Sequence, residues 1–351
     1  MTATQGFLSG VIEGFYGRPW SHEDRRRYAA FLAELDCNAY LYCPKNDPYL
    51  RKQWQQHWPS DDWERLLDLA AHYRDSGINF GVGLSPFALY ADYGQAQRDL
   101  LRAKVETLNE LGAPLLAILF DDMPGDIADL AARQAEIVAD VATWASGQRL
   151  LVCPTYYSDD PVLEKHFGAR PEGYWEQLGR ELDPGVDIFW TGPQVCSERI
   201  SAGDLEHVTA DLGRPLVLWD NYPVNDGAVR SNHLYCRRFE GRDSLPGGNL
   251  AGHFCNPMNE ALVSLPALQG LADLYGHVPK PDFLERSLGA ACWAQLSQNT
   301  DEFQELGLSG MGEERCQALA LVYDKLAGSA ASEVAGWLRG EYTFDPACLT
   351  D

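Results

Sequence analysis

Short apolar runs alternate with longer amphipathic segments along most of this chain. Eight of the runs are candidate strands. Most are continuously apolar rather than alternating, which is typical of parallel strands buried on both faces. They span residues 10–15, 37–43, 78–84, 115–120, 149–155, 186–191, 215–219 and 250–256.

Helices are predicted between these strands. Ser21 is the expected N-cap of the first, with Asp24 reaching back in a variant of the capping box, and Ser60 opens the second. Further helices are predicted over residues 95–112, 126–145, 171–182, 200–212 and 258–275. The connection 226–248 shows no helical period. Eight strands with intervening helices predict a (β/α)8 TIM barrel. A doubly wound open sheet is the alternative, but the first strand is not followed by the glycine-rich turn GxGxxG.

Residues 276–281 predict a linker, because two prolines within three positions stop a helix. Helical patterns follow at residues 283–298, 313–326 and 332–338. We therefore expect a barrel domain over residues 1–276 and a short C-terminal helical segment over residues 277–351.

Composition narrows the classes of function. The formal net charge is −23, so nucleic acid and anionic membranes would be repelled. No apolar run is long enough for a membrane-spanning helix, and no secretory signal is visible at the start. The nine cysteines form no CxxC pair, which favours reduced thiols in the cytoplasm and gives no zinc-ligand spacing.

Active sites of such barrels form at the C-terminal ends of the strands. The sharpest candidate there is Asp121-Asp122, directly after a buried strand. Adjacent carboxylates repel each other, so we expect one pKa to be raised, as suits a general acid. Two alternatives stay open: either Asp caps the next helix, or the pair binds a divalent metal with Asp226 or His253.

Residues at other strand ends have two possible roles, one structural and one functional. Lys45 is either a solvated loop lysine or a cation that lines the pocket. Trp190 and Trp219 either pack in the barrel and its helices or form a pocket wall against a sugar ring or an acetyl group. The short polar residues are either turn formers or groups that bind hydroxyls: Asn221, Asp226 and Asn256. His253 is expected in the core. Tyr156 and Tyr157 are expected to point oppositely, so that one enters the pocket.

These motifs together resemble the catalytic domain of glycoside hydrolase family 84, the O-GlcNAcases and bacterial β-N-acetylglucosaminidases. The similarity runs in order from residue 8 to about residue 275. Its motifs are GVIEGFYGRPW at 10–20, NAYLYCPK at 38–45, FDD at 120–122, CPT at 153–155, WTGP at 190–193, WDN at 219–221, ND at 225–226 and NP at 256–257. The family fold is a (β/α)8 barrel.

The resemblance implies a retaining exo-β-N-acetylglucosaminidase that needs no cofactor or metal. The substrate's own 2-acetamido oxygen would attack the anomeric carbon and form an oxazoline. Asp121 resembles the residue that holds the acetamido N–H, and Asp122 resembles the general acid and base. Substrate-binding positions are matched by Gly14, Lys45, Tyr157, Trp219, Asn221, Asp226 and Asn256.

The expected substrate is a GlcNAc-bearing glycoside or glycoprotein, with O-GlcNAc on Ser or Thr included, and a homodimer is left open. Two features depart from the family pattern: Tyr156 replaces an acidic residue of animal members, and residues 123–125 change the loop after the Asp pair. Two other functions remain alternatives, a metal-dependent hydrolase and a carbohydrate-binding pseudoenzyme on the same barrel.

Overall fold

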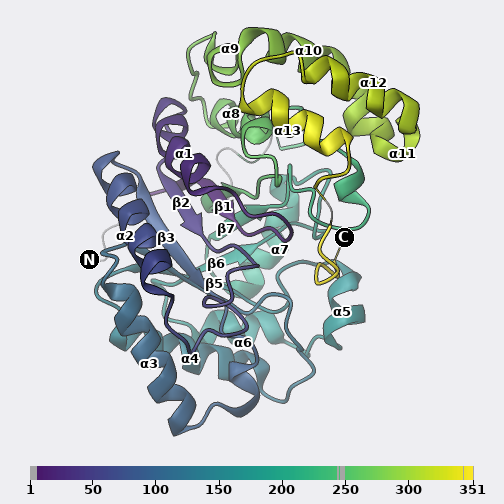
Figure 1. The fold of residues 1–351 in the computed structure, drawn as a ribbon. Helices are drawn as coiled ribbons and strands as arrows, with labels where there is room; N and C mark the ends of the chain where they lie inside the picture. The colour runs from purple at the N-terminus through teal and green to yellow at the C-terminus, as the bar shows by residue number, and fades with distance from the viewer. Residues whose placement is uncertain (1–5, 243–244, 246–249, 343, 351) are drawn as a thin grey trace.

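The computed structural model describes residues 6–242, 245, 250–342 and 344–350. Within them, eight parallel strands close into a barrel in chain order, with β8 pairing back onto β1 (Figure 1). The closed barrel confirms the predicted (β/α)8 fold and excludes the open sheet. The strands are β1 Leu8–Glu13, β2 Ala39–Tyr42, β3 Asn79–Leu84, β4 Leu115–Leu119, β5 Arg149–Cys153, β6 Asp187–Trp190, β7 Leu216–Asp220 and β8 Leu250–Cys255.

Helices cover the outside of the barrel, as the amphipathic segments predict. They are α1 His22–Glu34, α2 Ser60–Asp75, α3 Gln95–Asn109, α4 Leu130–Trp144, α5 Pro161–Phe167, α6 Tyr174–Glu181, α7 Ala202–Leu212 and α8 Leu265–Leu274. The sequence prediction missed α5, which Asp160 caps with its side chain and Pro161 begins. It also started α4 four residues too early, since residues 126–129 are not helical and α4 begins at Leu130.

The first helix begins as predicted but is capped differently. The Ser21 side chain accepts from the Asp24 N–H at 3.1 Å, so Ser21 is the N-cap. The Asp24 carboxylate accepts the Ser21 hydroxyl hydrogen instead of reaching the backbone N–H. The reciprocal capping box occurs at α7, between Ser201 and Asp204.

The predicted linker leads into further helices that gather at one side of the barrel (Figure 1). They are α9 Phe283–Leu288, α10 Ala290–Asp301, α11 Gly307–Met311, α12 Glu313–Tyr323 and α13 Ser329–Leu338. Half-buried Glu333 of α13 accepts the backbone N–H groups of Leu262 and Val263, which precede α8. The Trp337 indole donates to the Ser231 carbonyl in the long loop after β7. These helices therefore pack on the loops that follow β7 and β8.

Beyond α13 the chain turns back toward the barrel, drawn in yellow in Figure 1. No helix of the described residues is both long and apolar enough to cross a membrane.

Candidate active site

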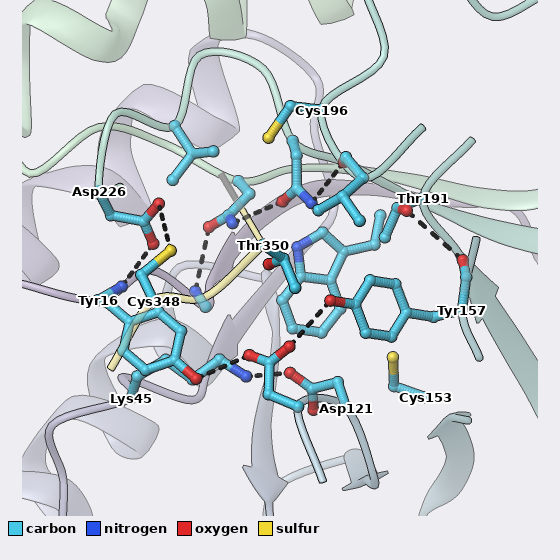
Figure 2. Close-up of a pocket in the computed structure, with 17 residues that line it drawn as sticks. Tyr16, Lys45, Asp121, Cys153, Tyr157, Thr191, Cys196, Asp226, Cys348 and Thr350 are labelled. Carbon is cyan, nitrogen blue, oxygen red and sulfur yellow. Dashed lines mark hydrogen bonds and ion pairs between the residues drawn. The ribbon is translucent and has the colours of Figure 1, made fainter. Parts of the chain in front are cut away.

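One pocket at the C-terminal ends of the strands contains all nine of the site residues predicted from sequence (Figure 2). It is lined by Gly14, Tyr16, Lys45, Asp121, Asp122, Cys153, Tyr157, Thr191, Val195, Cys196, Trp219, Asn221, Val224, Asp226, Asn256, Cys348 and Thr350. Residues from seven of the strand ends thus meet Cys348 and Thr350 in one place.

Asp121 and Lys45 form a buried ion pair at the base of the pocket. The Lys45 ammonium donates to Asp121 Oδ2, and the two side chains are only 4% and 6% exposed. Burial lowers the pKa of Lys45, but the charges of Asp121 and Asp122 and the hydrogen bond to Asp121 together hold it above its ordinary value. Lys45 is therefore a pocket cation and not a solvated loop lysine. The other Asp121 oxygen, Oδ1, is buried and has no hydrogen-bond partner within the described chain.

Asp122 is held from both sides by tyrosine hydroxyls. Tyr16 donates to Oδ2 at 2.7 Å and Tyr157 donates to Oδ1 at 2.9 Å. The backbone of Asp122 adopts a left-handed φ of 56°, a conformation that non-glycine residues seldom adopt. Asp122 thus turns sharply after β4, so that neighbouring Asp side chains reach the same pocket.

The electrostatics of Asp122 differ from the sequence expectation of a raised pKa. Burial raises the pKa, but the Lys45 and Arg51 cations hold it below the ordinary value for an aspartate. The two tyrosine hydrogen bonds act in the same direction, because they stabilise the charged form. In this structure Asp122 is therefore an anion near neutral pH.

Arg51 was missed by the sequence analysis. It is buried, donates to the Ser85 hydroxyl at 3.2 Å and to the Asp122 carbonyl at 3.4 Å, and lies over the Tyr16 ring. Its position in the loop between β2 and α2 carries no pattern that distinguishes it from a surface arginine. Only the folding of that loop against the end of β4 brings it to Asp122.

The opposite wall is formed by the Trp219 indole, which lies against Gly14. A Cβ atom on Gly14 would come within 2.2 Å of Trp219 Cζ2, so glycine is needed for this close approach. The indole Nε1 is buried without a hydrogen-bond partner among the described residues. Cys153 lines the pocket as well, and burial raises the pKa of its thiol.

Amides form the side of the pocket next to Trp219. Asn256 accepts from the Gly14 N–H at 3.3 Å and donates to Asn221 Oδ1 at 2.8 Å, and Asn221 donates to the Val195 carbonyl at 2.8 Å. These bonds set the orientation of both amides. Both amides are therefore held in fixed orientations at the pocket wall.

Asp226 closes the remaining side. Its Oδ2 accepts the Tyr16 backbone N–H at 2.7 Å, while burial raises its pKa to about 6. His253, the other predicted partner of a metal, lies in the core as expected. Its ring bonds to Asp220 Oδ2 at 3.2 Å and to the Tyr275 hydroxyl at 3.1 Å. Across the described ranges, no three His, Cys, Asp or Glu side chains are grouped as metal ligands.

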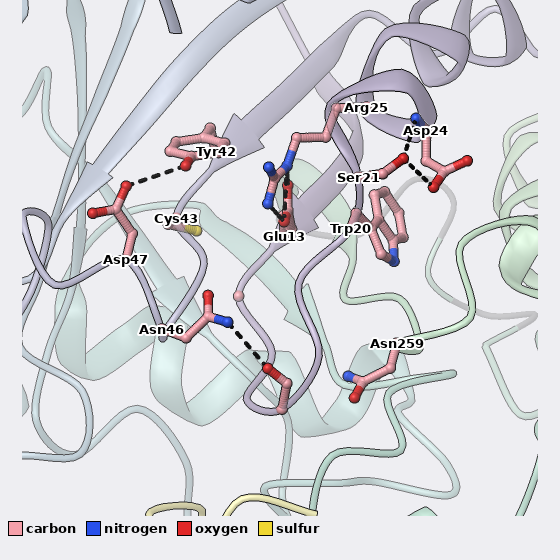
Figure 3. A network of polar contacts seen from close by, with 12 residues as sticks. Glu13, Trp20, Ser21, Asp24, Arg25, Tyr42, Cys43, Asn46, Asp47 and Asn259 are labelled. Carbon is pink, nitrogen blue, oxygen red and sulfur yellow. Dashed lines mark hydrogen bonds and ion pairs between the residues drawn. The ribbon is translucent and has the colours of Figure 1, made fainter. Parts of the chain in front are cut away.

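A second polar network supports the loops that carry Gly14 and Lys45 (Figure 3). Arg25 of α1 binds both carboxylate oxygens of fully buried Glu13, the last residue of β1. The Asn46 amide donates to the Gly17 carbonyl at 3.1 Å and so joins the loops after β1 and β2. Both loops are therefore fixed to the barrel beside the pocket.

Two predicted aromatic residues lie elsewhere. Trp190 is buried, makes an edge contact with His207 of α7 and does not line the pocket, so its packing role is the correct reading. Tyr156 and Tyr157 do point apart: Tyr156 donates to the Gly168 carbonyl, and Tyr157 enters the pocket. The sequence analysis also did not single out eight residues that line the pocket. Three of them stand inside the family motifs, namely Tyr16, Cys153 and Thr191. The other five lie outside every motif: Val195, Cys196, Val224, Cys348 and Thr350.

A (β/α)8 barrel with an adjacent carboxylate pair and an aromatic, amide-rich pocket at the C-terminal strand ends has the architecture of a glycoside hydrolase. The β-N-acetylglucosaminidase family model matches residues 9–307. The chain therefore belongs to this family, glycoside hydrolase family 84.

Individual relatives agree with this assignment. The protein O-GlcNAcases of Rattus norvegicus and Mus musculus are 29% and 30% identical over 278 residues, 77% of this chain. The chain spans only 30% of the length of these two relatives. A solved mutant of the Thermobaculum terrenum O-GlcNAc hydrolase is 26% identical, with a TM-score of 0.78 over 96% of this chain and 81% of that chain.

Replacing Arg51 should change the charge state of the pocket. Arg51→Met is expected to raise the pKa of Asp122, because one of two nearby cations is lost. Carbon-13 NMR titration of Asp-labelled protein measures the shift, with Asp122→Asn to assign the signal. Arg51→Lys keeps the charge and should retain the low pKa. An equal rise in both variants would show that the charge of Arg51 is not the cause.

Proposed function

We propose that this chain removes terminal β-linked N-acetylglucosamine, including O-GlcNAc on Ser or Thr of proteins, with retention of configuration. The observation that carries the proposal is the Asp121 carboxylate. One of its oxygens is held by Lys45, and the other is buried in the pocket without a partner among the described residues. A buried acceptor of this kind is costly unless a ligand donor satisfies it. The acetamido N–H of a bound N-acetylglucosamine is such a donor.

In the proposed mechanism the substrate supplies the nucleophile. Asp121 accepts the acetamido N–H and turns the acetyl oxygen toward the anomeric carbon, where attack gives an oxazoline. Asp122 protonates the leaving oxygen and then takes a proton from the water that opens the oxazoline. Substrate-assisted glycosidases use two carboxylates in this way, with neither one as nucleophile.

The low pKa of Asp122 in the free protein must rise before it can act as an acid. A sugar in the pocket displaces water from around Asp122, and burial raises the pKa of a carboxyl group. Tyr16 and Tyr157 both donate a hydrogen bond to the Asp122 carboxylate here. Protonation turns one carboxylate oxygen into a hydroxyl that is itself a donor, so the hydrogen bond from the tyrosine at that oxygen would have to be given up. Asp122 thus gains its proton as part of forming the enzyme–substrate complex.

The other pocket groups are assigned to sugar binding. Trp219 and Tyr157 would enclose the acetyl group, since an indole wall suits a methyl group. Hydroxyl groups of the sugar would bind the Gly14 carbonyl, Lys45, Asp226 and Asn256, with Asn221 orienting Asn256.

The cellular location and the bacterial source of the enzyme are also proposals. No disulfide joins any of the nine cysteines, and this supports a reducing, cytoplasmic location. Similarity to the Thermobaculum terrenum hydrolase supports a bacterial enzyme. The homodimer remains a prediction.

The metal-dependent alternative can be tested directly. Lys45 already supplies the cation that Asp121 faces, so we expect turnover without a metal. Hydrolysis of an aryl N-acetyl-β-glucosaminide should proceed at the same rate before and after dialysis against EDTA. A large loss that a divalent ion restores would favour the metallohydrolase, and no turnover in either state would favour the pseudoenzyme.

Replacing either aspartate should reduce the rate of hydrolysis, but with a different dependence on the leaving group. Asp122→Ala removes the general acid, whose contribution is about 10²–10⁴-fold, so poor leaving groups should suffer most and activated aryl groups least. Asp121→Ala should slow every substrate, because oxazoline formation is impaired. A series of aryl leaving groups measures both patterns, and identical losses across the series would contradict these roles.

The nucleophile can be tested through the acyl group. Fluorine on the acetyl carbon withdraws electron density from the carbonyl oxygen, so rates should fall steeply from acetyl to trifluoroacetyl. The measurement is kcat/KM for aryl glycosides along this series. If a carboxylate of the protein attacked instead, rates would hardly change, and a 2-fluoro glycoside would leave an adduct visible by intact-protein mass spectrometry.

A further inference from the structure

The segment after α13 returns to the mouth of the barrel (Figure 1), where Cys348 and Thr350 line the pocket. Asp345 to Cys348 forms a β-turn in which the Cys348 N–H donates to the Asp345 carbonyl at 2.9 Å, with Pro346 at the second position, which that residue favours. The Asp345 side chain also accepts the Ala347 N–H at 2.9 Å. The turn is thus stabilised from within, and it directs the following residues into the pocket.

Residues of this segment that line the pocket are buried or half-buried, whereas a neighbour that points away from it is exposed. Thr350 is 9% exposed and lines the pocket, whereas Leu349 beside it is 50% exposed. Cys348 lines the pocket too. Figure 2 shows Cys348 beside Asp226 and Thr350 in the middle of the pocket.

Both inward residues contact groups that the proposed function assigns to the sugar. The Cys348 thiol lies 3.8 Å from Asp226 Oδ1 as its hydrogen-bond donor. A hydrogen bond from the Thr350 side chain opposes the rise in the pKa of Tyr157 that burial causes. Since Tyr157 donates to Asp122, the Thr350 hydroxyl is linked through one side chain to the carboxylate pair.

The space that remains is too small for a sugar. The cavity volume is about 40 Å³, room for a few water molecules. Pockets that hold small molecules usually have volumes of roughly 300–1,000 Å³. The residues around this cavity nevertheless form a complete set of carboxylates, amides and an indole. Cys348 and Thr350 line this small cavity together with those groups.

We propose that residues 345–350 are an internal competitive ligand of the sugar-binding pocket, so that N-acetylglucosamine binds only when this segment leaves. Thr350 takes the place of the sugar against Tyr157, and Cys348 takes the place of a sugar hydroxyl at Asp226. This inference rests on the proposed sugar-binding role of the pocket. The open state binds substrate with its intrinsic affinity, and the apparent affinity falls by the fraction of molecules that are open.

Truncation tests the proposal. A stop codon in place of Phe344 should lower KM for an aryl N-acetyl-β-glucosaminide by about threefold or more and leave kcat unchanged, because the competitor is absent while the chemistry is intact. Thr350→Ala should give a smaller fall in KM. Leu349→Ala, which alters the exposed neighbour, is the matched control and should behave as the full chain does.

Addition of the segment in trans provides the converse test. A synthetic peptide of residues 344–350 should inhibit the truncated protein competitively, and the same peptide with alanine for Thr350 should inhibit less. An unchanged or higher KM after truncation, with normal thermal unfolding, would overturn the proposal. Absence of hydrolysis by both full-length and truncated protein would instead overturn the proposed function.

A measurement on the full chain avoids any effect of truncation on folding. A thiazoline fused to N-acetylglucosamine, which resembles the oxazoline, should displace the segment and speed alkylation of Cys348 by at least about threefold. Peptide mass spectrometry locates the label, and buried Cys37 serves as the internal control. Slower alkylation of Cys348 with the thiazoline bound would show that ligand and segment occupy the pocket together, and would refute the proposal.

Discussion

The rest of the site depends on two adjacent carboxylates at the end of β4, of which Asp121 is buried and Asp122 is half-buried. An unpaired buried anion is strongly unfavourable, so each carboxylate needs partners. Asp121 receives Lys45 from the loop after β2, and Asp122 receives Tyr16 from the loop after β1 and Tyr157 from the loop after β5. The charge at β4 therefore fixes how three other strand ends are arranged.

These partners require support of their own. Arg25 neutralises Glu13 at the end of β1, and Asn46 joins the loop that carries Lys45 to the loop that carries Tyr16. Without this second network, Lys45 and Tyr16 would lose their fixed positions and the carboxylates would lose compensation. The pocket is accordingly preorganised by polar contacts outside it, in the way that catalytic groups are generally held by a supporting shell.

The same polar surfaces that suit a sugar also suit a short stretch of the chain. Asp226 and Tyr157 bind the thiol and the hydroxyl of residues 348 and 350 by the hydrogen-bonding chemistry they would offer to sugar hydroxyls and an acetamido group. The segment leaves Asp121 Oδ1 and the Trp219 indole N–H without partners among the described residues, so a ligand that satisfies them has an advantage over the segment, because buried donors and acceptors are costly when left without partners.

The apolar runs and their spacing were sufficient to predict the eight strands, their parallel order and the barrel, because continuous burial on both faces leaves a local signature. The family motifs at the strand ends likewise identified the nine pocket residues, Asp121 and Asp122 among them. Arg51 and Thr350 could not be found in this way. Each lies in a segment with no distinctive pattern, and only contacts between elements distant in sequence bring Arg51 to the Asp122 carbonyl and Thr350 into the pocket. The depressed pKa of Asp122 also depended on tertiary structure, since it results from charges brought close in space rather than along the chain.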